Sequence, residues 1–150
     1  VPEVVLAALE HASQTSPELE AVIARDWLAP GAEEAAAAFV EEYTGIWNRN
    51  RTIFVVRNLA AEEGDTRFYE ARMTQARPMM DAISKQVERA QAAGRTPAHL
   101  SPRSCAGTVL MILERLSAIG PMSSHSDGVG YDDLKAAAAH SIAMMLGARW

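Results

Sequence analysis

Residues 65–93 read DTRFYEARMTQARPMMDAISKQVERAQAA, and their apolar side chains recur at alternating steps of four and three. That spacing places them on one face of an α-helix. Phe68, Met79 and Ala82 widen this face, while charged residues occupy much of the remaining surface. Gly94 suits the left-handed position that ends a helix. The central stripe of the predicted helix consists of Tyr69, Met73, Ala76, Met80, Ile83, Val87 and Ala90.

Pro78 lies in the middle of this predicted helix. Proline removes one backbone hydrogen bond and pushes against the carbonyl of Thr74, four positions earlier, so we expect a bend there. A face this apolar must be covered by other helices, and a bend can leave room between them. The flexible methionines at the same place suit an adaptable apolar pocket, although methionines at helical spacing also suit a plain core.

The composition suits one globular domain of 150 residues, with 49% hydrophobic and 22% charged residues. The net charge is −5 and no Lys/Arg cluster is dense enough for a phosphate-binding stripe, so the chain alone is a poor candidate for DNA or RNA contact. A single cysteine, Cys105, excludes an internal disulfide. No apolar run reaches membrane-spanning length and no signal peptide is present, so we expect a cytoplasmic protein. Because the first residue is Val1, the chain is either processed or a fragment.

Helical periodicity and start and stop signals recur along the whole chain. Ser16-Pro17 and Ser101-Pro102 are capping residues followed by a proline suited to the first helical turn. Residues 53–56, taken alone, are compatible with a buried strand, but no second strand candidate exists. We therefore expect a helix there, with Val55, Val56, Leu59 and Ala60 facing inward. The sequence predicts an all-α bundle of about seven helices, near residues 1–12, 17–27, 33–48, 52–63, 66–93, 105–119 and 131–146.

Phe39, Tyr43 and Trp47 are spaced four residues apart and form an aromatic ridge on the predicted helix 33–48. Such a ridge is either ordinary core packing or one wall of an aromatic-lined cavity, and the spacing alone leaves both readings open.

Residues 105–119 are apolar on nearly every side, with only Glu114 and Arg115 charged. A helix of this kind is buried on all sides, so one side should face the core and the other a partner chain. Ala136 to Ala139 give the last predicted helix a smooth surface for close helix approach. These two helices therefore predict a homodimer.

The sequence contains no residue pattern typical of a catalytic, metal or cofactor site. None of His11, His99, His125 and His140 has a partner at metal-ligand spacing, and there is no Gly-rich phosphate loop. His125 lies in the Ser/Gly-rich segment 122–130, which we expect to be a solvated loop. Cys105 is expected to be a structural thiol. We therefore predict no enzyme, no metal and no cofactor.

Two polar residues are of interest. Arg77 borders the apolar stripe and either pairs with Asp81 at i, i+4 or meets an acidic ligand group. Glu114 lies in the most hydrophobic helix, where an unpaired charge is costly. We expect it to form a buried, hydrogen-bonded pair or a contact across a dimer.

Four segments together resemble the C-terminal regulatory domain of TetR-family transcriptional repressors, of the actinobacterial type that includes the ethionamide-resistance regulator. They are residues 39–51 (FVEEYTGIWNRNR), residues 87–95 (VERAQAAGR), residues 110–116 (LMILERL), and a final segment with Asp132-Asp-Leu-Lys and Met145-Leu-Gly. The likeness covers about residues 33–147. The helix-turn-helix that precedes this domain in the family is not in this sequence, so it was either removed or never present.

The resemblance implies a small, mostly apolar effector whose binding releases the repressor from its operator, with DNA contacted only through the missing N-terminal part. It places ligand-binding residues at Phe39, Tyr43, Trp47, Phe54, Met73, Ala76, Met79, Met80, Ile83, Leu110, Leu113 and Glu114. It places the dimer interface on the helices 105–119 and 132–146, with Val109, Ile112, Leu116, Ile119, Leu134, Ala138, Ile142 and Met145.

Two functions of other classes compete with this reading. A helical protein–protein adaptor would have a solid core without a cavity. A small helical enzyme acting on an anionic substrate would need several inward-facing Arg or Lys residues, whereas the inward positions here are apolar.

Overall fold

The computed structural model describes residues 1–12, 14–121 and 128–149, so the predicted loop around His125 lies largely outside the described residues. Within these ranges the chain forms helices and no strand, which confirms the all-α prediction. The second helix is shorter than predicted, since it ends at Ile23. The helices are α1 (Pro2–His11), α2 (Pro17–Ile23), α3 (Ala32–Arg49), α4 (Arg51–Glu62), α5 (Thr66–Ala92), α6 (Pro102–Ile119) and α7 (Tyr131–Met145).

Side-chain caps fix three of the helix starts. The Ser16 hydroxyl accepts a hydrogen bond from the Leu19 backbone N–H at 3.1 Å. The Ser101 hydroxyl accepts one from Ser104 N–H at 3.2 Å, and the Asp65 carboxylate accepts one from Arg67 N–H at 3.0 Å. Each cap satisfies a backbone donor that the first helical turn leaves unpaired. The predicted start signals are therefore confirmed.

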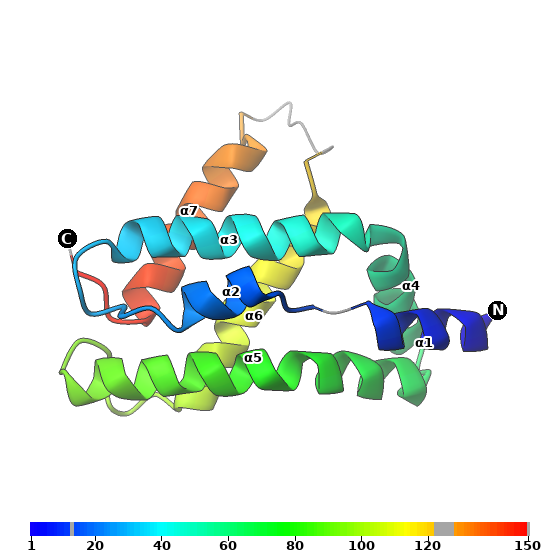
Figure 1. Ribbon diagram of the computed structural model, residues 1–150, viewed down its shortest axis with the longest axis horizontal. Helices are drawn as coiled ribbons and strands as arrows, with labels where there is room; N and C mark the ends of the chain where they lie inside the picture. The colour runs from blue at the N-terminus through cyan, green and yellow to red at the C-terminus, as the bar shows by residue number, and fades with distance from the viewer. Residues whose placement is uncertain (13, 122–127, 150) are drawn as a thin grey trace.

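The bundle is organised around α3 and α5, which run in opposite directions with α2 between them (Figure 1). Helices α6 and α7 cross this pair, α6 packing mainly against α5 and α7 mainly against α3. Helix α4 joins α3 to α5 at the end of the bundle where α1 also lies (Figure 1). None of the described helices is both long and apolar enough to cross a membrane.

Helix α5 continues through Pro78 without interruption. Its buried face is anchored by Phe68, Ile83 and Val87. The predicted stripe is wrong at its N-terminal end, where Tyr69 is 49% and Met73 44% exposed. Phe68 takes the inward position there because it precedes the buried Met79 by eleven residues, about three helical turns, and so shares its side of the helix. The exposed Met73 becomes important for the site below.

Helix α4 also turns a different face inward than predicted. Val55, Val56 and Leu59 are 37%, 38% and 54% exposed, so the expectation that they face the core is wrong. Phe54 and Arg57 are buried instead, each with no exposed surface. The Phe54 ring meets Trp47 edge-on at 5.6 Å, which holds α4 in this rotation.

Candidate functional site

A cavity of about 440 Å³ lies between α4, α5 and α6. Helix α3 and the connection between α1 and α2 contribute one residue each, and these are Tyr43 and Gln14. The complete lining is Gln14, Tyr43, Asn58, Glu62, Arg72, Met73, Ala76, Met79, Met80, Gly107, Leu110, Met111, Glu114, Arg115 and Ala118.

The walls of this cavity are mostly apolar. Met73, Ala76 and Met80 follow one another on α5 at helical spacing, and Leu110 and Met111 face them from α6. Met73 and Met111 are 44% and 66% exposed, so the cavity is open to solvent along these two thioethers. Methionine side chains adapt to irregular shapes at low cost. The walls therefore suit an apolar molecule that covers them.

The floor of the cavity is polar and organised by Glu114. Its Oε1 atom accepts hydrogen bonds from Gln14 Nε2 at 3.0 Å, from Trp47 Nε1 at 3.2 Å and from the Tyr43 hydroxyl. Its Oε2 atom faces the Arg57 guanidinium at 3.4 Å. This cluster matches the prediction of a buried, hydrogen-bonded pair at Glu114.

The charges on this floor are compensated. Burial, and then the neighbouring Glu114 carboxylate, raise the pKa of the Tyr43 hydroxyl well above its usual value, so Tyr43 remains a neutral donor. Burial lowers the pKa of Arg57, and the Glu114 charge opposes that shift. The guanidinium also lies 4.7 Å from the centre of the Phe54 ring. At the floor a ligand thus meets a fixed pair with no net charge, whereas Glu62, Arg72 and Arg115 are charged residues elsewhere in the lining.

Gln75 extends the same network to α1. Its side-chain oxygen accepts a hydrogen bond from Arg57 Nη1 at 2.9 Å. Its side-chain nitrogen donates to the backbone carbonyls of Leu9 at 3.0 Å and Ala12 at 2.9 Å. Gln14 makes the second link, because it lies just beyond α1 and bonds Glu114 directly. The cavity floor and the C-terminal end of α1 therefore share one hydrogen-bond network.

The structure brings seven of the predicted ligand-binding residues to this cavity and leaves five behind its walls. Phe39, Trp47, Phe54, Ile83 and Leu113 are buried in the core and do not line the cavity. Phe39 packs edge-on against Trp27 at 6.2 Å, and Trp47 contributes only through its bond to Glu114. The seven that line the cavity are Tyr43, Met73, Ala76, Met79, Met80, Leu110 and Glu114.

Several residues that line the cavity were not identified from the sequence. Gly107, Met111 and Arg115 are spaced four residues apart on α6 and share the Leu110 side of the helix, so their periodicity was a usable signal. Gln14 offered none, since it lies outside any helix and reaches Glu114 across 100 positions of sequence.

The structure places Arg77 away from the site. It is exposed and does not line this cavity. The expected pairing of Arg77 with Asp81 is not formed, because Asp81 pairs with Arg103 of α6 at 2.7 Å.

The residues predicted for the dimer interface divide into two groups. Val109, Leu116, Ala138 and Ile142 are buried inside the single chain, where they pack α6 and α7 onto the core. Ile112, Ile119, Leu134 and Met145 are only partly buried. The exposed side of α7 is formed by Ala136, Ala137, His140, Ser141 and Met144.

Comparison with known protein families finds one that matches most of the chain. The profile of the tetracyclin repressor-like C-terminal domain matches residues 19–149. This chain belongs to that family. Tetracyclin repressor-like C-terminal domains serve transcription regulators in effector binding and dimerisation, and they are not enzymes. Neither a curated protein nor a solved structure matches the chain. Among the described residues, no group of His, Cys, Asp and Glu side chains is arranged to hold a metal ion.

Proposed function

We propose that this tetracyclin repressor-like domain senses a small, mostly apolar effector in the cavity between α4, α5 and α6, and that occupancy releases the repressor from its operator. The observation that carries the proposal is the pair of exposed methionines, Met73 and Met111, in the wall of a cavity of about 440 Å³. That volume lies in the range of about 300–1,000 Å³ typical of ligand sites. An apolar ligand gains free energy by covering both thioethers.

The partners of Glu114 support an uncharged group at the cavity floor. Oε1 already accepts three hydrogen bonds, and Arg57 balances the carboxylate charge. A charged ligand group pressed against this pair would lose water without gaining an unpaired counterion. The apolar part of the effector therefore belongs here.

The domain further acts as a homodimer through the outer side of α6 and α7. The residues that support this are the exposed Ala137 of α7 and the partly exposed Ile112, Ile119, Leu134 and Met145. An arginine at Leu116 or Ile142 is a poor test, because these residues are in the core of the single chain. Ala137→Arg should split the dimer in light scattering, whereas Ala37→Arg on the exposed side of α3 should not. A wild-type chain that stays monomeric at high micromolar concentration contradicts the dimer.

The actinobacterial subtype and a cytoplasmic site of action belong to the same proposal. The subtype is supported by the likeness of residues 110–116, which include Glu114, and it remains a prediction. The cytoplasm is proposed because a repressor must reach its operator DNA there.

The experiment that tests effector sensing is thermal melting with 1-octanol and 1-decanol as probes. Mass action stabilises a protein by about 2.7 kcal/mol at a hundredfold excess over the dissociation constant. Ala76→Trp places a ring in the cavity and should abolish the shift in melting temperature while the fold is kept. The matched control Ala37→Trp adds the same ring at an exposed position and should keep the shift.

The alternative function makes the opposite prediction. In an adaptor domain with a solid core, Ala76→Trp overpacks the interior and costs roughly 1–3 kcal/mol or more. Two results together would favour the adaptor function over effector sensing. They are a strongly destabilised Ala76→Trp variant and a wild-type melting temperature that no apolar probe shifts.

A further inference from the structure

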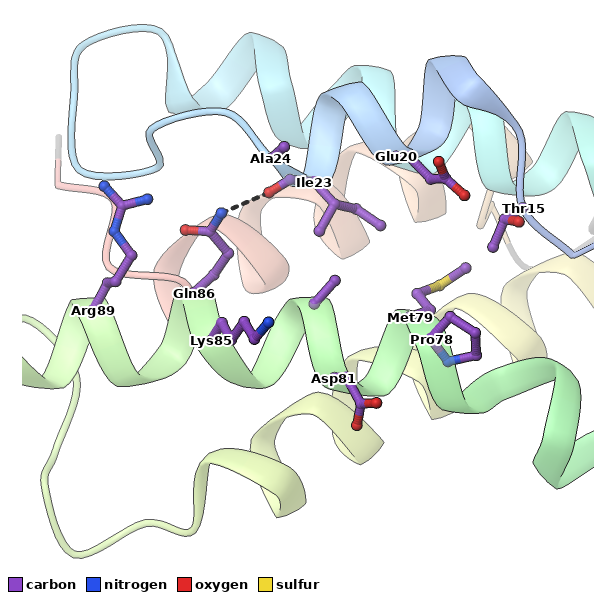
Figure 2. Close-up of a pocket in the computed structure, with 11 residues that line it drawn as sticks. Thr15, Glu20, Ile23, Ala24, Pro78, Met79, Asp81, Lys85, Gln86 and Arg89 are labelled. Carbon is purple, nitrogen blue, oxygen red and sulfur yellow. Dashed lines mark hydrogen bonds between the residues drawn. The ribbon is translucent and has the colours of Figure 1, made fainter.

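A second cavity, of about 560 Å³, lies on the other flank of α5 (Figure 2). Its walls come from α2, from Thr15 and Ala24 on either side of that helix, and from the part of α5 that begins at Pro78. The lining residues are Thr15, Glu20, Ile23, Ala24, Pro78, Met79, Asp81, Ala82, Lys85, Gln86 and Arg89. Nothing in the proposed function uses this cavity.

The two cavities have one lining residue in common and meet a common segment of the chain. Met79 lines both of them and is only 2% exposed. Gln14 lines the first cavity and Thr15, its neighbour in the chain, lines the second. In Figure 2 the thioether of Met79 extends toward Thr15 at one end of the second cavity. Met79 and the Gln14–Thr15 segment therefore border both spaces.

Methionine is suited to act as a movable wall. It is unbranched and has rotatable bonds up to the thioether, so it changes rotamer more easily than a β-branched residue of similar volume. A change of the Met79 rotamer that turned its side chain away from this position would join the two cavities. Their volumes of about 440 and 560 Å³ would together reach the upper end of the range for ligand sites.

The second cavity has a polarised rim. Lys85 and Arg89 lie at the end away from Met79, whereas Glu20 lies at the Thr15 end (Figure 2). Lys85 forms no ion pair with any carboxylate that the structure describes, and Asp81 is already held by Arg103 at 2.7 Å. Arg89 has a loose, exposed contact with Asp26 at 3.8 Å. An anionic group is therefore favoured at the Lys85 end.

We propose that the two cavities form one elongated site for a long-chain carboxylate. The carboxylate lies at Lys85 and Arg89, and the apolar chain passes Met79 and ends between the methionines of α5 and α6. This inference rests on the proposed function, since it assigns a ligand class to the same effector site. It also gives Met79 a specific task, which is to set the length of chain that the site accepts.

The test is a series of dissociation constants measured by calorimetry on the 150-residue chain. The probes are octanoate, decanoate, laurate and palmitate, each below its micelle concentration, and the alcohols of the same chain lengths. In the wild type the affinity should keep rising through palmitate, by up to roughly fourfold per methylene. In Met79→Ile, a stiff residue of similar size, the rise should stop at a shorter chain.

The head group is tested separately. Lys85→Glu should weaken the binding of the carboxylates about tenfold and leave that of the alcohols unchanged, because one charge at the exposed rim is reversed and its attraction for a carboxylate becomes repulsion. Arg77→Glu is the matched control, as it makes the same charge change on the same helix outside both cavities.

The outcomes separate this inference from the proposed function. If octanoate and decanol bind but affinity stops rising at the same chain length in wild type and Met79→Ile, the cavities are separate and the inference fails while the sensor stands. Equal carboxylate affinity in Lys85→Glu and Arg77→Glu overturns the head-group assignment. If no probe binds at all, both proposals fall. Met79→Ile is preferred to Met79→Ala because it leaves no large void in the core.

Discussion

Two ion pairs tie α6 to its neighbours, and the one with the shorter contact is expected to matter less. Arg103 and Asp81 approach to 2.7 Å, with side chains 57% and 54% exposed. Arg57 and Glu114 are 3.4 Å apart, but the Arg57 side chain has no exposed surface and Glu114 only 26%. Water and salt screen the first pair and not the second. Burial, rather than distance, decides how much stability depends on each pair.

The buried pair also carries a cost in free energy. Taking two charges out of water is costly, and the network around Glu114 offsets this cost only while every member is present. The exposed pair carries no such cost, because either partner alone is well solvated. Single substitutions should therefore have very unequal effects at the two places.

The largest effect is expected for Arg57→Leu. It leaves Glu114 without its counterion in a partly buried site, which should lower the free energy of unfolding by about 3–5 kcal/mol. The measurement is urea denaturation at fixed protein concentration. Adding Glu114→Leu to the same chain should recover part of the loss, since no charge is then buried. If Arg57→Leu alone is as stable as wild type, burial does not decide how much each ion pair contributes to stability.

A middle-sized effect is expected for Tyr43→Phe, which removes one donor from Glu114 without removing a charge. The loss should be about 1–3 kcal/mol at neutral pH. The pKa of Tyr43 is raised in the folded state, so its contribution is fully present below the unfolded pKa of about 10 and is lost as the pH rises through the folded pKa. The difference between wild type and Tyr43→Phe should therefore shrink above about pH 10. A constant difference up to strongly alkaline pH would show that Tyr43 does not titrate with folding.

The smallest effect is expected for Asp81→Asn at the exposed pair. Such pairs contribute about 0.2–1 kcal/mol, and the contribution falls as salt is added. Urea denaturation at low and high sodium chloride checks both statements. A loss above about 2 kcal/mol that persists in high salt would mean that the pair is far less solvated than its exposure indicates.

The sequence was sufficient for the helices because their signals are local. Ser16, Asp65 and Ser101 cap helices through neighbours two or three residues away, and apolar periodicity marks the rest. The rotation of α4 was not accessible in this way. Val55 and Val56 outweigh one phenylalanine in any local pattern, whereas Phe54 faces inward because Trp47 and the Glu114 cluster lie there.

The candidate site shows the same division. Met73, Ala76 and Met80 were found because one helix places them on one wall. Gln14 and Gln75 were not, since they bond Glu114 and the carbonyls of α1 across long stretches of sequence. A polar residue in a connection carries no periodic signal, and its partner is known only once the chain has folded.

The attachment of α1 has a mechanical consequence. Gln75 holds the C-terminal end of α1 through the backbone carbonyls of Leu9 and Ala12. Nearer the N-terminus, Val5 and Leu6 pack against the core, and Glu3 makes an exposed contact of 3.4 Å with Arg67. The hydrogen bonds that anchor α1 thus lie at the end beside the cavity floor. The ten residues of α1 extend about 15 Å, so a tilt of about 10° about its C-terminal end would move its N-terminal end by roughly 3 Å. A change in the hydrogen bonds of Gln75 that tilted α1 would therefore move its N-terminal end by about the length of a hydrogen bond.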